Sequence, residues 1–406
     1  MSTEQPTLTD PAVLIDPYPA LAWLRDHDPV HWSAEAHSWV ITRHADVTAA
    51  FRDPRLSADR VKVLVHIALA GGDPTPVREY LRITSDMMLM KDGPEHHRLR
   101  VLGNRGFTPR ALASWSPRVE KVIGELLGSV RPDGRFDLVA DLTEPMPASV
   151  IAEMFSIPKG DHHLFRTWAD DLARFFGGSV RDPADDALRA NTAAVEFERY
   201  FLRLYDARKQ KPGDDLMSLF QAAEEVGKLS AAEVVAQCQL ILVAGHVTTI
   251  DQLANGVYAL LRHEGTLERL ATTPELVKSA VEEMIRFDPS VTLLMRVATE
   301  DIPMHGKEIR AGQLVLLSLA AANRDPAVFA DPGRFDIART PNKHVGFGVG
   351  HHQCLGMNLA RMELEASLRA LLKRFPRLSL DPERLPVRKC DSLIFRGFAR
   401  LPVRVA

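Results

Sequence analysis

Apolar residues recur at helical spacing along most of this chain, and shorter alternating stretches lie toward both ends. Residues 30–44, VHWSAEAHSWVITRH, predict a β-hairpin, and further strands are predicted in residues 297–326 and in the tail, residues 385–405. The segments GGDPTP, RPDG, GGSVRDPADD and KPGDD separate the helices predicted for the middle, because glycine and proline favour turns. The pattern therefore predicts a mainly α-helical protein with smaller β-sheets, an α+β fold in one compact unit.

One predicted helix is unusually long. Ser230 and Glu233 form a capping box, and Gly265 follows the last residue expected to be helical. About 34 residues lie between these signals, which corresponds to about 50 Å of helix at ~1.5 Å per residue. Polar residues interrupt the apolar pattern, namely Gln237, Gln239, His246, Asp251, Gln252 and Asn255. We therefore expect a buried central helix rather than a membrane span.

The middle of this helix, LILVAGHVTTID, combines small residues with hydroxyl groups. Ala244 and Gly245 leave room beside the helix, and Thr248 and Thr249 put hydroxyls next to that gap. Threonines within helices often only hydrogen-bond to the carbonyl four residues earlier. From these residues alone, a packing role and a functional role both stay open.

Charge and cysteine content narrow the function classes. The formal net charge is −3, with 50 basic and 53 acidic side chains, which argues against a general nucleic-acid-binding protein. Cys238, Cys354 and Cys390 are too few and too scattered for a disulfide framework and fit a reducing compartment. The polar, proline-rich start MSTEQPTLTDPAVLIDPYP has no basic segment followed by an apolar run. We expect a cytoplasmic protein without a signal peptide or membrane anchor.

A cysteine lies in the glycine-rich segment GFGVGHHQCLG, residues 346–356. The alternating glycines do not have the spacing of a phosphate-binding loop. A zinc site at His351, His352 and Cys354 would lack the second pair of ligands that structural zinc usually has. A single thiolate that binds a large planar cofactor fits better, because glycines let the backbone pass close to the cofactor and amide N–H groups can stabilise the sulfur. The helix that follows would stabilise a thiolate further through its dipole.

This segment resembles the haem-binding loop of the cytochrome P-450 family, Phe-x-x-Gly-x-x-x-Cys-x-Gly, with Phe347, Gly350, Cys354 and Gly356 at the fixed positions. Other family motifs follow the same order, since EEMIR, DPGRFD, DGPEHHRLR and LVAGHVTT each resemble a family segment. The resemblance covers nearly the whole chain. It implies the single-domain cytochrome P-450 fold of the soluble bacterial type, with a long central helix over the haem, a catalytic domain over residues 19–406 and an N-terminal arm over residues 1–18.

The resemblance also implies a cofactor, haem b, with Cys354 as the axial ligand of its iron. A thiolate ligand pushes electron density onto the iron. Phe347 would pack near the sulfur, and Gly348 would contribute to the cofactor site. The residues implied to hold the haem propionates are His96, Arg100, Arg296 and His352, with His344 as a weaker addition.

Two further sets of residues follow from the resemblance. Glu283 and Arg286, three residues apart on a helix, would meet Arg334 in a buried charge network that fixes the cysteine loop. The substrate pocket would draw on residues 60–90, 175–179, 240–248, 291–295 and 393–394, most of them apolar. Its individual candidates are Leu240, Val243, Val291, Thr292, Leu293, Leu294 and Ile394.

One position departs from the family. Most members carry an acid before the threonine of the central helix, as in Ala-Gly-x-Asp/Glu-Thr, where this chain has Ala244, Gly245, His246, Val247 and Thr248. In the family the acid helps to deliver protons for oxygen activation, and Thr248 is kept. His246 is adjacent, but one residue is about 100° of helix rotation, so it should point elsewhere. Three explanations stay open: water or substrate supplies the proton, the reaction is less proton-demanding, or the position was deliberately changed.

The resemblance favours a monomeric haem-thiolate monooxygenase. It would take electrons from a ferredoxin and ferredoxin reductase, activate O₂, and hydroxylate or epoxidise a small apolar organic substrate in bacterial secondary metabolism or xenobiotic oxidation. Oxidative coupling or cyclisation, or a peroxide-driven reaction, is the alternative that Val247 keeps open. A haem sensor without turnover is less favoured, because Thr248 lies beside an apolar pocket.

Overall fold

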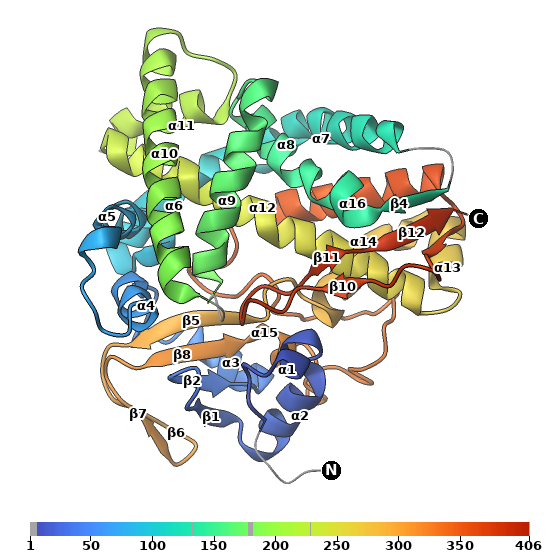
Figure 1. Cartoon of the computed structure of the whole chain (residues 1–406), viewed down its shortest axis with the longest axis horizontal. Coiled ribbons are helices and arrows are strands. Elements are labelled where there is room, and N and C mark those ends of the chain that lie inside the picture. The colour runs from blue at the N-terminus through green and yellow to red at the C-terminus, as the bar shows by residue number, and fades with distance from the viewer. Residues whose placement is uncertain (1–5, 131–133, 178–181, 228, 406) are drawn as a thin grey trace.

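The long apolar stretch forms α12 (Ala231–Arg262), the helix around which the other helices pack in the computed structural model (Figure 1). The structure describes residues 6–130, 134–177, 182–227 and 229–405. The capping box is confirmed, because Ser230 and Glu233 each accept the other's backbone N–H. The predicted end is wrong: α12 stops at Arg262, and Gly265, with φ +72°, is instead the N-cap of α13 (Thr266–Thr272). By length and composition α12 could cross a membrane, but 72% of its most apolar window is buried inside the protein.

Helices make up most of the described chain, which confirms the predicted class. The remaining helices are α1 (Pro11–Ile15), α2 (Tyr18–His27), α3 (His44–Ala50), α4 (Val61–Ala68), α5 (Arg78–Ser85), α6 (Gly93–Gly106), α7 (Pro109–Ser129), α8 (Pro145–Met154), α9 (His162–Phe176), α10 (Pro183–Gln210), α11 (Leu216–Gly227), α14 (Val277–Phe287), α15 (Leu319–Ala322) and α16 (Met357–Arg374). Shorter helical turns are η1 (Thr75–Val77), η2 (Met88–Met90), the π-helix η3 (Val139–Thr143), η4 (Lys159–Asp161) and η5 (Pro274–Leu276).

The larger sheet has the strand order β1-β2-β8-β5-β3. Its strands are β1 (Val30–Ser33), β2 (Ser38–Ile41), β3 (Leu56–Ser57), β5 (Leu293–Ala298) and β8 (Leu314–Ser318). β1 and β2 form the predicted hairpin, and β2 pairs with β8 in parallel. The smaller sheets are β4 (Arg135–Asp137) with β12 (Pro402–Val405) and β9 (Leu378–Leu380), β6 (Ile302–Met304) with β7 (Lys307–Ile309), and β10 (Val387–Arg388) with β11 (Phe398–Arg400).

Glycines allow α12 to approach its neighbours closely. A Cβ at Gly245 would lie 2.3 Å from Cδ1 of Ile151 on α8, and one at Gly256 would lie 1.8 Å from Cε of Met284 on α14. Figure 1 shows α12 crossing the helical part of the molecule. The larger sheet lies together with α1, α2 and α3 at the end of the molecule away from most of the helices. This packing brings the middle of α12 and the start of α16 into the wall of one cavity.

Candidate functional site

A central cavity of about 260 Å³ lies between α12 and the cysteine loop. Thr248 of α12 and Cys354 of the loop both line it, together with residues of α6, α8 and α16 and the segment that leads into β5. Most of its wall is aliphatic or aromatic. The cavity therefore joins the two motifs that the sequence singled out, although more than a hundred residues separate them in the chain.

The loop holds Cys354 by backbone interactions. Its N–H donates to the carbonyl oxygen of Phe347 at 2.9 Å. Gly348 and Gly350 have φ values of +65° and +80°, which side-chain-bearing residues rarely adopt. The thiol is accessible from the cavity. The loop thus presents one sulfur to the cavity in a fixed backbone frame.

Groups around Cys354 shift the pKa of its thiol in opposite directions. Burial raises the pKa of the thiol, whereas the N–H of Gly356 and the positive charges of Arg100 and Arg361 lower it. The Arg361 guanidinium also lies 4.7 Å from the centre of the Phe347 ring. A cationic metal at the sulfur would add to the influences that favour a thiolate.

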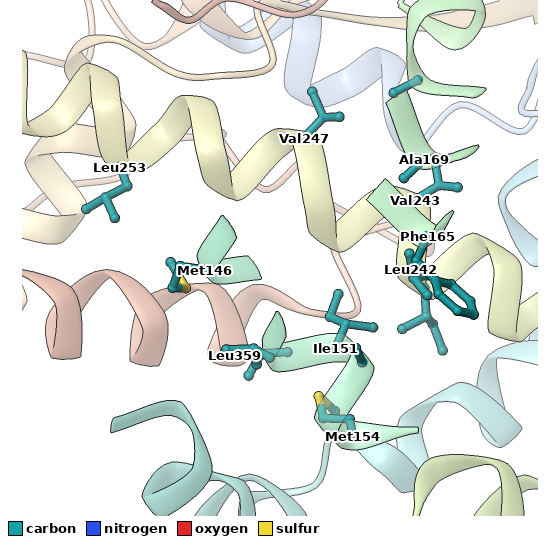
Figure 2. Close-up of a cluster of buried hydrophobic side chains, with 14 of the residues drawn as sticks. Met146, Ile151, Met154, Phe165, Ala169, Leu242, Val243, Val247, Leu253 and Leu359 are labelled. Carbon is teal, nitrogen blue, oxygen red and sulfur yellow. The ribbon is translucent and has the colours of Figure 1, made fainter. Parts of the chain in front are cut away.

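The α12 wall contains the small residues predicted for the site. Ala244, Gly245 and Thr248 line the cavity, and Ala244 is exposed although it lies in the middle of a buried helix. The Thr248 hydroxyl donates to the Ala244 carbonyl at 2.8 Å, so its oxygen can still accept a hydrogen bond. Val247 lies on another face: Figure 2 shows its side chain pointing away from Ile151, which lines the cavity.

Basic side chains gather at one end of the cavity. His96, Arg100 and His352 line it, and the His96 and His352 rings lie 4.0 Å apart. Burial and the neighbouring positive groups lower the pKa of His96 to about 4. Burial lowers the pKa of His352, and the charge of Arg296, which is 4% exposed, lowers it further, whereas Asp92 raises it.

Arg60, which the sequence analysis did not single out, belongs to the same cluster. It is 4% exposed, and its Nε has no hydrogen-bond partner among the described residues. Burial, reinforced by Arg296, lowers the pKa of Arg60 to about 9, and burial lowers that of Arg296 to about 10. Asp92 is the carboxylate that acts on both. No sequence motif marks Arg60, because its role depends on the fold.

These features fit a haem. Within the described part of the chain, the buried cations lack enough carboxylate partners, which the two propionates would supply. The sulfur of Cys354 lines the same cavity. The fit rests on the chemistry of the donors. We name as the haem cluster the residues Arg60, His96, Arg100, Arg296 and His352.

His344 departs from its predicted role. Its Nε2 lies 3.0 Å from Glu282, whose carboxylate also pairs with Arg361, and its side chain is 3% exposed. The ring is therefore committed to an ion-pair network behind the cysteine loop and not to the haem cluster.

The buried charge network is confirmed for two of its three predicted members. Arg286 and Glu283 are fully buried and form paired hydrogen bonds of 2.7 and 2.8 Å. Arg334 is wrong as the third charge: its side chain is 68% exposed, and it contributes only its carbonyl oxygen, 3.0 Å from Nη2 of Arg286. Arg339 takes that place, with its Nε 3.2 Å from both oxygens of Glu283.

The predicted pocket residues separate into two groups. Leu240, Val291 and Leu294 line the central cavity. The structure puts the other four elsewhere: Val243 is buried in the main apolar cluster, Thr292 and Leu293 line a second cavity of about 30 Å³, and Ile394 is buried in the apolar cluster that includes Leu293. Of the predicted turn 175–179, positions 178 and 179 lie outside the described residues. Residues of the wall that were not predicted include Phe107, Ile151, Gln252, Ile285 and Glu363.

Comparison with known proteins agrees with this geometry. The family profile described as Cytochrome P450 matches residues 63–403. The chain is 39% identical to nocardicin C N-oxygenase of Nocardia uniformis subsp. tsuyamanensis, over 96% of each protein. It is 36% identical to cytochrome P450 monooxygenase PikC of Streptomyces venezuelae, over 99% of this chain and 96% of PikC.

Solved structures give the same result. The crystal structure of P450BioI, in complex with an acyl carrier protein ligated to hexadec-9Z-enoic acid, superposes with a TM-score of 0.89 at 32% identity and covers 97% of this chain and 99% of that one. Together with the cavity, which Cys354 and the middle of α12 both line, these likenesses show that the chain belongs to the cytochrome P450 family of haem-thiolate monooxygenases, in its bacterial branch.

Proposed function

We propose that this protein is a haem b monooxygenase that hydroxylates or epoxidises a small, mainly apolar organic substrate with electrons from a ferredoxin. The observation that carries the proposal is the shared cavity of Cys354 and Thr248, whose other walls are largely apolar. We further propose a cytoplasmic monomer in which residues 19–406 form the catalytic domain and residues 1–18 an arm.

The proposed roles of the side chains follow from their positions. When bound, haem supplies the iron at which O₂ is activated. Cys354 is the proposed thiolate ligand, and the haem cluster is the proposed partner of the propionates. Phe347 and Gly348 are proposed to support the ligand loop. Ala244 and Gly245 leave space on the α12 side, where the Thr248 hydroxyl would accept or donate a hydrogen bond during oxygen activation.

The wall of the cavity supports an apolar substrate. Leu240 and Ile241 face it from α12, and Val291 and Leu294 from the segment around β5. Burial of such surface stabilises a complex by about 25 cal/mol per Å² of apolar area removed from water. Relatives named as an N-oxygenase of nocardicin C and as the monooxygenase PikC support a role in secondary metabolism.

The experiment that tests this function is turnover in ¹⁸O₂ with ferredoxin, ferredoxin reductase and reductant. Candidate substrates are first selected by the shift of the haem absorption band that follows displacement of water from the iron. We expect product that carries one labelled oxygen atom. An oxidised product without label, formed by coupling or cyclisation, would contradict oxygen insertion.

Val247 gives rise to a specific prediction. If proton delivery depends mainly on Thr248 and water, the missing acid should leave product formed per reductant oxidised low, because positioned proton donors typically contribute ~10²–10⁴-fold to a rate. In that case Val247→Glu should raise this ratio and Thr248→Ala should lower it further. A high ratio of product to reductant in the wild-type protein, together with a lower ratio in Val247→Glu, would show that Val247 does not limit proton delivery by Thr248 and water. That result would support specialised coupling chemistry.

We also propose that ferredoxin binds the face that carries Cys354, near Arg98, Lys343 and Arg361. Lys343 is exposed, whereas Arg98 pairs with Glu95 and Glu233, and Arg361 pairs with Glu282.

Opposite charges accelerate encounter and are screened by salt, so electron transfer should slow by up to ~10-fold as ionic strength rises. Stopped-flow reduction at several salt concentrations measures this. A rate that does not respond to salt would remove the electrostatic part of the proposal.

A further inference from the structure

A buried carboxyl group lies in the wall of the central cavity, beside α12. Glu363 of α16 is 2% exposed and lines the cavity together with Thr248 and Thr249. Its Oε1 has no hydrogen-bond partner among the residues that the structure describes, whereas the Thr249 hydroxyl interacts with its carboxyl group. A buried polar atom without a partner is costly, so its presence beside an oxygen-binding motif points to a function.

A second unpartnered hydroxyl follows on the same helix. Ser367 is fully buried, and its Oγ has no partner within the described part of the chain. Because Ser367 comes four residues after Glu363, the two side chains share one face of α16. The helix therefore has a polar line, Glu363 and then Ser367, inside otherwise apolar packing.

Among the residues that the structure describes, no charged neighbour stabilises an ionised Glu363. The elements α7, α12 and α14 pack against α16. Their charged groups are Arg110, Arg118, Glu120, Lys121 and Glu125 on α7, Glu233, His246, Asp251 and Arg262 on α12, and Lys278, Glu282, Glu283 and Arg286 on α14. None of them is among the causes that set the pKa of Glu363, which burial raises to about 8 against a smaller opposing effect of Thr249. The side chain is thus a neutral acid near pH 7.

We propose that Glu363 is the acid that delivers protons to the oxygen-binding side of the cavity, in place of the acid that Val247 replaces. The inference rests on the proposed monooxygenase function and names a further catalytic residue for it. Each turnover takes up protons because the second oxygen atom of O₂ leaves as water.

The transfer balances over three groups. The O–H bond of Glu363 breaks and its proton passes to the Thr249 hydroxyl oxygen, whose own proton moves on to an acceptor in the cavity. The Glu363 carboxylate then regains a proton from solvent through the Ser367 hydroxyl. No oxidant or reductant enters this step.

The first test does not use activity. Glu363→Gln keeps the shape of the side chain and removes its titratable proton, and Glu365→Gln on the same helix, which is only half-buried, is the matched control. Infrared spectra of the haem-loaded protein should show a carbonyl stretching band from the protonated Glu363 carboxyl. This band should disappear as the pH rises, with a midpoint near pH 8. The band should be lost in Glu363→Gln and kept in Glu365→Gln. A band that persists in Glu363→Gln would overturn the assignment.

Thermal unfolding gives an independent readout. The folded-state pKa of Glu363 lies above its unfolded value, so the wild-type protein loses stability as the pH rises from about 5 to 8. Glu363→Gln should therefore melt at a higher temperature than wild type at pH 8 and at a similar temperature at pH 5. Equal melting temperatures at both pH values would contradict a neutral buried acid.

The second test measures product per reductant oxidised and peroxide released. Glu363→Gln should lower the ratio by ~10²-fold and raise peroxide release, with haem content and substrate binding unchanged. Ser367→Ala should lower the ratio less, and Val247→Glu added to Glu363→Gln should recover it. An unchanged ratio in Glu363→Gln would overturn the delivery role. A wild-type protein that binds haem but forms no oxygenated product would instead contradict the proposed function itself.

Discussion

Replacement of Cys354 by serine is expected to leave a folded protein whose haem has lost the thiolate signature in the reduced, carbon monoxide-bound absorption spectrum. Cys354 is the cysteine that lines the central cavity, and the Phe347 carbonyl and the Gly356 N–H hold the loop around it. A serine oxygen is a much weaker electron donor to iron than a thiolate. We expect turnover with ferredoxin and O₂ to fall below detection in this variant.

The matched controls are Cys238→Ser and Cys390→Ser. Cys238 is fully buried on α12, and burial raises the pKa of its thiol well above the usual value. Both controls should keep the thiolate spectrum. If either abolished the signature while Cys354→Ser kept it, the ligand assignment would be wrong.

Removal of the Glu283 carboxylate should be the most destabilising single change outside the cavity. Arg286 and Glu283 are both fully buried, and Arg339 also bonds to Glu283. Truncation of one partner leaves buried positive charge without its carboxylate, which typically costs about 3–5 kcal/mol. Glu283→Ala should therefore lower the free energy of unfolding by about that amount, as measured by urea denaturation of the haem-loaded protein.

Arg334→Ala is the control for this prediction. Its guanidinium is 68% exposed, and the substitution keeps the backbone carbonyl that accepts from Arg286. Its effect on the free energy of unfolding should stay within about 0.5 kcal/mol. An equally large loss for Arg334→Ala, or a loss below 1 kcal/mol for Glu283→Ala, would contradict this account of the network.

Local signals in the sequence predicted much of the fold. The capping box at Ser230 fixed the start of α12, and the alternation of residues 30–44 predicted β1 and β2. The end of α12 was wrong because Gly265 has the positive φ of a helix-ending glycine but begins the next helix instead. A glycine signal alone does not say on which side of it the helix lies.

Sequence motifs indicated the candidate site residues that lie within them. Residues that only folding brings to the site were missed. Cys354, His96 and Arg100, which the motifs mark, line one central cavity, and their roles toward a haem stay predictions. Arg339 replaces Arg334 in the charge network because the turn after Pro332 directs Arg334 to solvent, which a motif does not encode. Arg60 and Glu363 lie among other charged residues in the sequence, and their importance follows only from burial without a full set of partners.

Val247, which stands where most family members have an acid, does not line the central cavity. Its side chain lies off the cavity wall and points away from Ile151 (Figure 2), so the valine leaves the shape of the cavity intact. The valine leaves α12 without an ionisable group at this position, while Glu363 of α16 remains in the cavity wall beside Thr249. We therefore expect proton delivery to be rerouted rather than lost.

The most direct test of the account is the crystal structure of the haem-loaded protein. We predict electron density in which the iron is bonded to Sγ of Cys354, the propionates contact the haem cluster, and Thr248 and Glu363 border the space on the α12 side. Iron held by any other residue, or propionates directed away from Arg100 and Arg296, would contradict the central claim that Cys354 and the middle of α12 form one oxygen-activating site.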